Sequence, residues 1–439
     1  MNLSSFEKSG QSGLFTRGRR IYCNPHNNLT FYVPDGVTKI FAFAIGAGGG
    51  GKARTVSYNG DDYCSTGGAG GGYASGIISV SPGASITCTI GQGGRGKTAS
   101  DNNTAGGTTS FGSYLTAGGG GAGIDHNSYG SNWTYATKSG QGGSASTSGV
   151  SQGVAFAGGG TSPGYTNTSS VYAYRGGAGG GASSGSPWGP GTSKPQLGAL
   201  EAAGGAGWGS NMNQSVSCRG FMSSSNSPKW NATPGDGSAQ AASLFNVKYN
   251  NQNLGQSNGK GGNGITARGG SFYQQTGRDV YQTTNTLSAL SGSDDSCVNG
   301  ENGNPNWWFP WDIDGGGGGS RCMNEANAYG RYDIACRGGD GGPGAGGGAV
   351  SSKDDNQSYS YSVGYGYQSR GGDGGIGGGG GGNFSFTPQT GGRPTGRVAG
   401  NGGFGGGGGG LYTYSSNDRG SNQTYQAGNG GNGLIIVYW

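Results

Sequence analysis

Residues 31–51 of this chain read FYVPDGVTKIFAFAIGAGGGG. Residues 37–45 are rich in β-branched and aromatic side chains and alternate over their central part, which predicts a β-strand. The Pro34-Asp35-Gly36 tripeptide before them is a turn sequence, because proline presets φ and glycine accepts a positive φ. The strand then runs directly into glycine at residue 46. The stretch therefore predicts β-structure whose chain continues as a glycine-rich segment.

Other strand patterns lie near the two ends of the sequence. Residues 29–33 precede the turn, residues 73–80 and 85–90 flank a Ser-Pro-Gly turn, and residues 434–439 form a strongly apolar end. We expect this C-terminal segment to pair with the N-terminal strands, which gives a small antiparallel β-sandwich. Little or no α-helix is expected, because the best helical pattern, residues 196–203, is short and interrupted by glycine.

Glycine supplies 109 of the 439 residues, and such a composition is typical of disordered chains. Two features oppose disorder: the chain has 8 Trp, 24 Tyr and 14 Phe, and only 11% of its residues are charged. The apolar fraction of 30% is nevertheless low, because ordinary domains reach about 45–50% with glycine included. The composition therefore favours an ordered state that depends little on side-chain burial. Flexible glycine-rich linkers are the alternative.

Glycine runs punctuate the middle of the chain, and the motif Arg-Gly-Gly-Asp-Gly-Gly occurs twice, at residues 337–342 and 370–375. Polyglycine can form polyproline II helices, which have about three residues per turn, a rise of about 3.1 Å and no internal hydrogen bonds. Such helices can pack closely, because glycine lets their backbones touch and bond to one another. We therefore expect an all-β plus polyglycine II architecture, in which the β-sandwich is continued by a bundle of polyproline-II-type helices with long end loops.

This architecture divides the chain into four parts. They are a basic N-terminal segment and candidate attachment arm at 1–20, sandwich strands and first glycine rods at 21–123, the glycine-rich bundle at 124–430, and the closing strand at 431–439. The variable loops of the bundle are expected at 124–152, 183–255 and 283–335. We expect these loops to carry any specificity, through tyrosine, tryptophan and asparagine contacts.

Four motifs in this order resemble the glycine-rich domain of bacteriophage tail fibre proteins and receptor-binding adhesins. They are residues 31–51, residues 72–83 with 86–94, TSFGSYLTAGGGG at 109–121, and GGNGLIIVYW at 430–439. The middle of the chain resembles the family only in its glycine runs. The resemblance implies a virion protein whose β-sandwich and polyglycine bundle present variable loops to a host surface. This chain departs from tip adhesins in having only about 20 residues before Ile21, so its mode of attachment is left open.

Residues 91–98 match the phosphate-loop pattern, with Gly91 followed by Gly96-Lys97-Thr98. A phosphate loop needs a following helix whose N-terminus holds the phosphates, but the sequence after Thr98 has no helical period. A chain this rich in glycine also produces such matches by chance. We therefore interpret the segment as a glycine-rich turn after a strand, with Lys97 and Thr98 facing solvent, and we expect no cofactor.

The residue types of catalytic and metal sites are sparse. Seven cysteines include no CxxC pair, and the two histidines, His26 and His126, are far apart in sequence, so no zinc site is indicated. Cys322 and Cys336 could form a local disulfide, and free buried thiols are expected for the rest. No carboxylate pair and no Ser/His/Asp motif stands out. We expect no enzyme activity, no catalytic residue and no metal.

The segment NPNWWFPWDID, residues 304–314, concentrates four aromatic side chains beside two carboxylates: Trp307, Trp308, Phe309, Trp311, Asp312 and Asp314. Flat aromatic faces next to carboxylates suit sugar rings, and rigid aromatics anchor interfaces. With Trp133 and Tyr135, these residues are the candidate receptor or partner contacts. The alternative, which the density of tryptophan favours, is that the cluster plugs a small core or caps the glycine rods. The two aspartates also resemble part of a calcium loop, but the full ligand pattern is missing.

The net charge is +5, and Lys and Arg are scattered except at Arg17-Gly18-Arg19-Arg20, so no nucleic-acid partner is expected. No apolar run approaches the about 18 residues of a membrane helix, and the opening MNLSSFEKSGQSG lacks the apolar region of a secretory signal. We expect no membrane insertion and synthesis in a cytoplasm.

The sequence therefore predicts a non-enzymatic bacteriophage fibre or appendage protein, an adhesin that recognises a bacterial surface through loops between glycine rods. Its expected partners are a bacterial cell-surface receptor, either a glycan or an outer-membrane protein, other virion proteins and, as a further option, a second copy of itself. Its expected location is the virion, assembled in the host cytoplasm and acting outside the cell. The alternatives are a purely structural fibre, a capsid decoration subunit or a self-assembling extracellular filament. Bulky tyrosines argue against an ice-binding surface.

Overall fold

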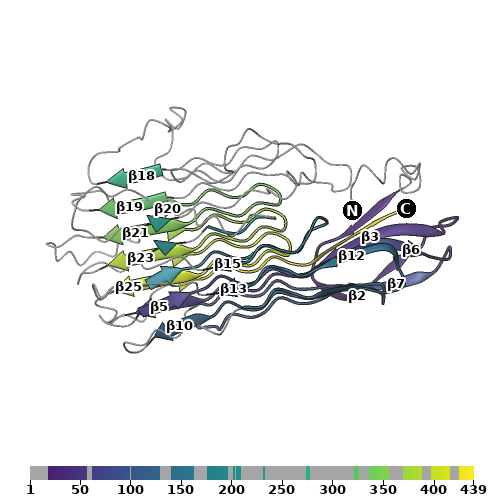
Figure 1. Ribbon diagram of the computed structural model, residues 1–439, viewed down its shortest axis with the longest axis horizontal. Helices are drawn as coiled ribbons and strands as arrows, with labels where there is room; N and C mark the ends of the chain where they lie inside the picture. Colours follow the sequence, from purple (N-terminus) through teal and green to yellow (C-terminus); the bar gives the residue numbers. More distant parts are fainter. Residues whose placement is uncertain are drawn as a thin grey trace.

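A computed structural model of the chain shows an elongated molecule built from β-strands and glycine-rich segments (Figure 1). It describes residues 18–56, 62–98, 100–128, 140–162, 176–195, 201–202, 204–208, 231–232, 273–276, 321–325, 336–354, 369–387, 397–415 and 425–439. Within these ranges no helix is present, and so none that could cross a membrane. Two antiparallel sheets lie at one end, parallel strands lie at the other, and the glycine-rich segments run between them.

The first sheet joins strands from the start, the middle and the end of the chain. Its order is β1-β27-β3-β6-β12, and all neighbours are antiparallel. The pairing of the C-terminal segment with N-terminal strands is confirmed, because β27 lies between β1 and β3. Arg19 and Arg20, which the sequence assigns to the N-terminal arm, lie in β1 instead. The strands are β1 (Arg19–Tyr22), β3 (Lys39–Ile45), β6 (Tyr73–Ser79), β12 (Ser151–Phe156) and β27 (Leu434–Tyr438).

The second sheet has the order β11-β9-β8-β7-β2 and is also antiparallel. The strands expected around residues 29–33 and 85–90 are present as β2 and β7. Three further strands were not predicted, because each has only three residues and little apolar alternation. The strands are β2 (His26–Tyr32), β7 (Ser85–Ile90), β8 (Thr109–Phe111), β9 (Leu115–Ala117) and β11 (Ala145–Thr147).

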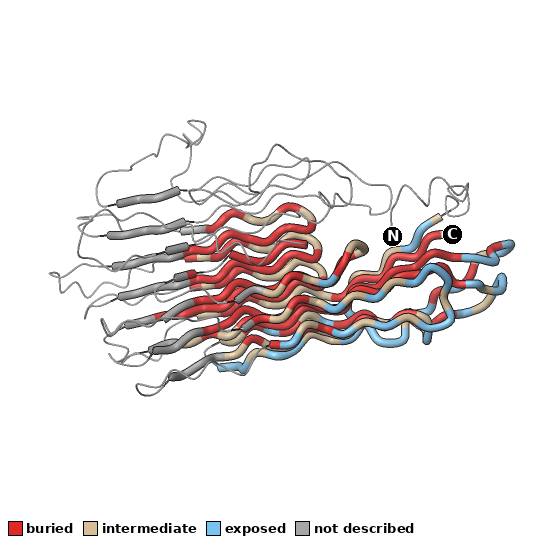
Figure 2. Tube along the Cα trace, in the orientation of Figure 1, coloured by how far each residue is buried: buried red, intermediate tan, exposed pale blue. Residues whose placement is uncertain are grey.

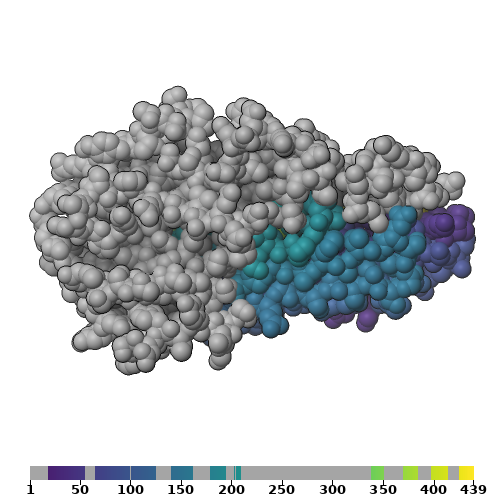
Figure 3. Space-filling view, viewed as in Figure 1, coloured from purple at the N-terminus to yellow at the C-terminus, as the bar shows by residue number. Residues whose placement is uncertain are grey.

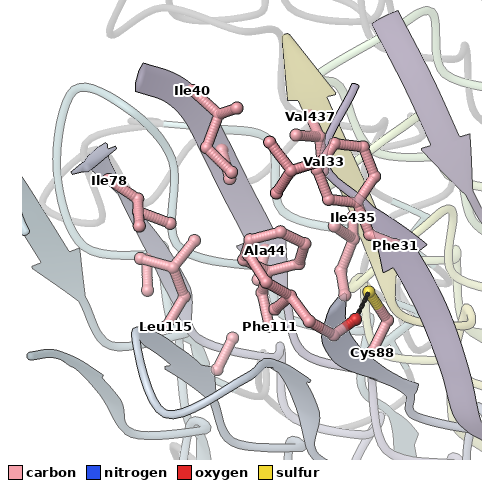
Figure 4. Packing of buried hydrophobic residues seen from close by; sticks show 14 of the residues in the cluster. Phe31, Val33, Ile40, Ala44, Ile78, Cys88, Phe111, Leu115, Ile435 and Val437 are labelled. Atoms are coloured by element: carbon pink, nitrogen blue, oxygen red, sulfur yellow. Dashed lines mark hydrogen bonds between the residues drawn. The ribbon is translucent and has the colours of Figure 1, made fainter. Parts of the chain in front are cut away.

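One hydrophobic core draws its side chains from both sheets (Figure 4). Ile40, Ala44 and Ile78 of the first sheet belong to the same buried cluster as Phe31 and Phe111 of the second. The rings of Phe31 and Phe111 lie 5.8 Å apart, within the range for favourable aromatic pairs. Burial of apolar area, at about 25 cal/mol per Å², is therefore the main stabilising term at this end of the molecule.

A second apolar cluster covers the opposite face of the first sheet. Phe43 stacks on Tyr73 with centroids 5.9 Å apart, and Trp208 meets Trp188 edge-on at 5.7 Å. Trp208 lies in the region 183–255, where the sequence predicts a loop, yet only 1% of it is exposed. Its Nε1 donates to Ser184 Oγ at 3.0 Å, so its polar atom is satisfied within the cluster.

The strands at the other end are short and mostly parallel. A six-stranded sheet has the order β18-β19-β21-β23-β25-β4, a four-stranded sheet β20-β22-β24-β26, and a third sheet β10-β5-β14-β16-β17, while β13 pairs with β15. Residues 201–202 of the helical candidate lie in β16, and residues 196–200 and 203 lie outside the described residues. The strands are β4 (Ala53–Val56), β5 (Asp62–Ser65), β10 (Asp125–Ser128), β13 (Thr161–Ser162), β14 (Gly176–Ala178), β15 (Lys194–Pro195), β16 (Glu201–Ala202), β17 (Asn231–Ala232), β18 (Tyr273–Thr276), β19 (Arg321–Glu325), β20 (Cys336–Arg337), β21 (Val350–Asp354), β22 (Ser369–Arg370), β23 (Asn383–Thr387), β24 (Arg397–Val398), β25 (Leu411–Ser415) and β26 (Tyr425–Gln426).

The glycine-rich segments bond to one another with a period of three residues. In segment 46–52, the N–H groups of residues 46, 49 and 52 donate to segment 66–72, those of 47 and 50 to segment 104–107, and those of 48 and 51 to segment 428–431. Carbonyl groups of the same segment accept from three more segments, 94–97, 120–123 and 408–411. Six neighbours therefore surround this segment, and Figure 2 shows the glycine-rich region as largely buried.

Glycine is needed in this region because the backbones touch. A Cβ atom built on Gly49 would fall on the carbonyl oxygen of Gly121, and one on Gly407 would fall on that of Gly68. Ala47 in the same segment is fully buried without such a clash. The packing therefore decides position by position where a methyl group fits.

Candidate functional site

The candidate site is the end of the molecule at which the parallel strands finish. Figure 1 shows the arrows of β19, β21, β23 and β25 pointing toward this end. The next strand in sequence, β20, β22, β24 or β26 respectively, lies in the four-stranded sheet and leads into a glycine-rich segment. Consequently the ends of successive strand pairs meet at one end, opposite the antiparallel sheets. In Figure 3 the N-terminal strands, coloured purple, form that opposite end.

Two of the four sequences that connect these strand pairs are rich in tyrosine, whereas residues 388–396 and 416–424, which join the other two pairs, contain none. Residues 355–368, between β21 and β22, read DNQSYSYSVGYGYQ, and residues 326–335, between β19 and β20, read ANAYGRYDIA. Tyrosine offers a large, rigid, amphipathic surface at low entropy cost, and serine, glycine and asparagine offer adaptable hydrogen bonds. These residue types are the ones that antibody binding loops use, so these two connections have the composition of a recognition surface.

A ladder of side-chain to backbone hydrogen bonds sets the spacing of the returning segments. Asp340 Oδ1 accepts from the N–H of Asp373 at 2.8 Å, and Asp373 Oδ1 accepts from that of Asn401 at 2.7 Å. Asn401 Oδ1 then accepts from the N–H of Asn429 at 2.9 Å, and Asn429 Oδ1 from that of Gly96 at 2.8 Å. Each side chain therefore satisfies the backbone of the next segment, which aligns the strands that follow.

This ladder explains why the Arg-Gly-Gly-Asp sequence occurs twice, because the aspartate of each copy accepts one of its hydrogen bonds. Asp340 and Asp373 are the aspartates of the two copies, and Arg337 is paired with Arg370 in parallel register. Arg370 Nη2 also donates to Asp373 Oδ2 at 2.6 Å. The ion pair is part-exposed, so its own contribution is small, about 0–1 kcal/mol; it restrains the aspartate in the orientation that the ladder needs.

Asn383 clamps the strands of the two parallel sheets where they leave the glycine-rich region. It is the first residue of β23 and is fully buried. Its Nδ2 donates to the carbonyl oxygen of Ser369 at 2.8 Å and to that of Val398 at 3.0 Å. One side chain thereby joins the start of an outgoing strand to two returning strands.

Residues 24–279, more than half of the chain, match the family model of the glycine-rich domain. The chain belongs to the glycine-rich domain family. No curated protein matches it. The family match covers the second sheet and most of the first, and it ends before the Asp340 ladder.

The contact residues that the sequence predicts for this glycine-rich domain protein all lie outside the described residues. They are Trp133, Tyr135, Trp307, Trp308, Phe309, Trp311, Asp312 and Asp314. Trp133 and Tyr135 lie in the connection that follows β10. The ladder residues were missed as a group, although the repeated Arg-Gly-Gly-Asp sequence was a signal that could have found them.

In this glycine-rich domain protein, the residues that match the phosphate-loop pattern lie at an edge of the glycine-rich region, where most of their N–H groups are hydrogen-bonded to neighbouring segments. Gly93 and Gly96 donate their N–H groups to asparagine side chains, Asn432 Oδ1 at 2.9 Å and Asn429 Oδ1 at 2.8 Å. The N–H groups of Gly94 and Lys97 donate to glycine carbonyls of segment 46–52. A phosphate site needs several amides that converge on the anion, whereas these amides are committed to separate protein acceptors. Lys97 itself is half-buried rather than fully solvent-facing.

A shallow polar depression of about 360 Å³ lies beside this edge. Glycine backbone and polar side chains line it, among them Arg95, Asp101 and Asn429. Among the described residues, no group of three or more His, Cys, Asp or Glu could hold a metal ion. The depression is therefore a polar surface without the residues of a metal centre.

Of the cysteines that the structure describes, Cys23 and Cys88 are free thiols. Burial in the core between the sheets raises the pKa of Cys88 to about 12. Because the thiolate is the reactive form, this cysteine is inert at neutral pH. His26 is exposed in β2, and His126 lies in β10, a strand of a different sheet. The disulfide between Cys322 and Cys336 stays a prediction.

Proposed function

We propose that this protein is a non-enzymatic bacteriophage fibre or appendage protein that recognises a bacterial surface, in the manner of a tail fibre tip adhesin. The observation that carries the proposal is that four successive strand pairs end on the side of the molecule opposite the antiparallel sheets, and that two of the sequences joining them are rich in tyrosine. Support also comes from the four sequence motifs that resemble phage tail fibre proteins. The expected partners are a surface glycan or outer-membrane protein and other virion proteins, and the expected location is the virion, acting outside the cell.

We interpret the glycine-rich region as a bundle of polyglycine II helices that continues a β-sandwich. Three observations support this interpretation. Hydrogen bonds of segment 46–52 repeat every third residue, as expected for about three residues per turn. The segment bonds to six neighbours rather than to two, as a strand would. Its glycines also touch neighbouring carbonyl groups where a Cβ atom would not fit.

Such a body suits recognition because its stability does not depend on the sequences at its far end. The glycine-rich segments are held by backbone hydrogen bonds to one another, so a changed connection leaves those bonds in place. Prepositioned strand ends also reduce the conformational entropy that a connection loses on binding. A virion protein that must follow changes in its receptor benefits from both properties.

Self-assembly into a filament is the competing function. The edge strands of the two antiparallel sheets have features that oppose assembly by strand pairing. The edge strand β1 begins with Arg19 and Arg20, and β2 and β12 both have register shifts. In the register shifts, Asn28 and Gln152 have φ values of 64° and 53°. Charges and irregularities of this kind prevent edge-to-edge pairing. A structural fibre or decoration subunit would therefore have to assemble through other surfaces.

The test uses the purified full chain and a panel of bacterial strains. We expect labelled protein to bind some strains in flow cytometry and to block infection of those strains by a phage that carries it. Periodate treatment of the cells removes binding to a glycan, and protease treatment removes binding to an outer-membrane protein. Absence of binding to all strains, together with fibres seen by electron microscopy, would favour the structural alternative.

Two matched variants locate the contact surface. Replacing the four tyrosines of residues 355–368 by serine should lower cell binding at least tenfold without changing the melting temperature. The control is Tyr32→Ser, because Tyr32 is 70% exposed on an antiparallel sheet at the opposite end. Equal loss of binding in both variants would mean that the strand-end connections are not the contact surface.

A further inference from the structure

Two antiparallel glycine-rich segments, 91–98 and 426–433, form the floor of the polar depression of about 360 Å³. The N–H of Gly93 donates to the side chain of Asn432, and the N–H of Gly96 donates to that of Asn429. The depression extends along the flank of the glycine-rich region, from the residues next to β7 and β27 to β26, an edge strand of the four-stranded sheet. It is therefore an elongated surface built on backbone that is already hydrogen-bonded.

Each of the two segments contributes three polar side chains to the depression, at intervals of three residues. They are Gln92, Arg95 and Thr98 from one segment, and Gln426, Asn429 and Asn432 from the other. On the polyglycine II interpretation, with about three residues per turn and a rise of about 3.1 Å, such side chains share one face and lie about 9 Å apart. The lining of the depression therefore repeats along its length.

The amide groups of the two asparagines are fixed in orientation. Oδ1 of Asn429 accepts from the N–H of Gly96 at 2.8 Å, and Oδ1 of Asn432 accepts from that of Gly93 at 2.9 Å. Because each oxygen faces the backbone, each Nδ2 group points away from that bond, and neither Nδ2 donates to a residue in the described part of the chain. An amide nitrogen carries two N–H donors. The depression therefore holds donors that lose little conformational entropy when a ligand binds.

The same surface offers acceptors and one side chain of each charge. In the floor, the carbonyl groups of Gly93 and Gly96 accept no hydrogen bond from the described residues, and such groups need a partner. Arg95 and Asp101 both line the depression and are exposed, but they form no ion pair with each other. Donors and acceptors that are open to a ligand therefore lie close together.

We propose that this depression binds a neutral sugar chain. A hydroxyl group both donates and accepts hydrogen bonds, so the hydroxyls of a sugar can use the amide donors and the carbonyl acceptors together. An anion would meet the carboxylate of Asp101 and the backbone carbonyl oxygens, and an apolar ligand would find no apolar side chain among the residues that line the depression. An extended sugar chain also presents hydroxyl groups repeatedly along its length, as the repeating lining requires.

This site differs in place and in chemistry from the tyrosine-rich connections. It lies on the flank of the glycine-rich region and uses amides, an arginine and backbone carbonyls, whereas those connections follow β19 and β21. The inference goes beyond the proposed function and does not depend on it, because its readout is sugar binding by the purified chain and not attachment to cells.

A glycan array that carries neutral oligosaccharides of bacterial surfaces tests the proposal with the purified full chain. We expect binding to at least one extended neutral glycan, whose affinity is then measured by calorimetric titration. Absence of binding to every glycan on the array would overturn the proposal. A parallel titration with inorganic phosphate should show no binding; binding of phosphate without binding of any neutral glycan would identify an anion site instead and would also overturn the proposal.

The double variant Gln92→Ala/Arg95→Ala locates the site. Neither side chain bonds to a described residue, and alanine keeps the backbone hydrogen bond from Arg95 to Thr104 Oγ1, so the melting temperature should not change. We expect the affinity for the glycan to fall by about tenfold or more, because the ligand loses hydrogen bonds that include one to a charged group.

The matched control is Lys97→Ala, which removes a positive charge from the same segment but from a residue that does not line the depression. This variant should keep the wild-type affinity. Unchanged affinity in the double variant would show that the glycan binds elsewhere, for example at the tyrosine-rich connections, and would overturn the proposal. An equal loss of affinity in Lys97→Ala would overturn it as well, because the effect would then be one of overall charge.

Discussion

A single methyl group in the middle of the glycine-rich region should be among the most costly small substitutions in this protein. Gly49 lies in segment 46–52, the segment with six neighbours. Its N–H donates to Ala69 at 2.9 Å, and its carbonyl accepts from the N–H of Gly408 at 3.0 Å. In Gly49→Ala the new Cβ falls on the carbonyl oxygen of Gly121. The obstacle is backbone, so no rotamer change can remove the clash.

The expected cost follows from these contacts. Overpacking by a methyl group costs about 1–3 kcal/mol even where side chains can move. Segment 46–52 must also shift away from segment 118–123, which lengthens the two hydrogen bonds of Gly49. A buried donor or acceptor that loses its partner costs about 1–3 kcal/mol. We expect the sum, about 2–6 kcal/mol, as the loss in free energy of unfolding of Gly49→Ala.

The matched control is Gly160→Ala, at a half-buried position where the nearest atom to a new Cβ is the Gly140 oxygen at 3.0 Å. Here a small shift suffices, and the lower entropy of the unfolded chain offsets part of the cost, by about 0.4–1 kcal/mol. Urea unfolding followed by tryptophan fluorescence measures both variants against the wild type. If Gly49→Ala is as stable as Gly160→Ala, backbone contact is not what holds these segments together.

The other predictions concern single side chains. Trp208→Ala removes a ring that is 1% exposed and a hydrogen bond to a buried serine, so it should cost about 3–5 kcal/mol in a urea titration; a cost below 1 kcal/mol would contradict its place in the core. Asn429→Ala leaves a backbone N–H of the neighbouring glycine segment without its acceptor and should cost about 1–3 kcal/mol. Lys97 Nζ has only an exposed 3.4 Å contact to an asparagine, so Lys97→Ala should change the free energy of unfolding by less than about 0.5 kcal/mol. Calorimetric titration with ATP should show no binding to the wild type or to the variant. ATP binding by the wild type that disappears in the variant would restore the phosphate-loop interpretation. Burial raises the pKa of both Cys88 and Tyr438 to about 12, from 9.0 and 10.0. The unfolded chain therefore loses these protons first, and the free energy of unfolding should fall as the pH rises from about 9 to 12; Cys88→Ala should make that fall shallower, and an unchanged slope would rule the thiol out as a cause.

Much of the antiparallel end could be predicted from the sequence, because its strands carry local signals. The run Lys39–Ile45 is dense in β-forming residues, and Leu434–Tyr438 has no polar side chain other than its tyrosine hydroxyl. Such segments form strands wherever they find partners. The short strands β8, β9 and β11 carry too few residues for a period, and only their pairing with neighbours defines them.

The candidate site was predictable in composition but not in position. The sequence shows that tyrosines gather in segments such as 355–368. It does not show that these segments leave from one end, because that follows from the parallel pairing of strands such as β21 and β23. In the same way, the position of Trp208 under the first sheet depends on contacts with Trp188 and Ser184, which local sequence does not encode.

Local sequence is enough to indicate the kinds of structure in this protein: apolar strands near its ends, and glycine where backbones have to touch. Which backbones touch depends on the tertiary fold. Gly48 donates to Gly431, and Gly93 to Asn432, pairs that are hundreds of residues apart in the chain. Glycine segments have no side chains to distinguish one neighbour from another, so their partners are set by the sheets and ladders at their two ends. The arrangement of the glycine-rich region is therefore a property of the whole fold.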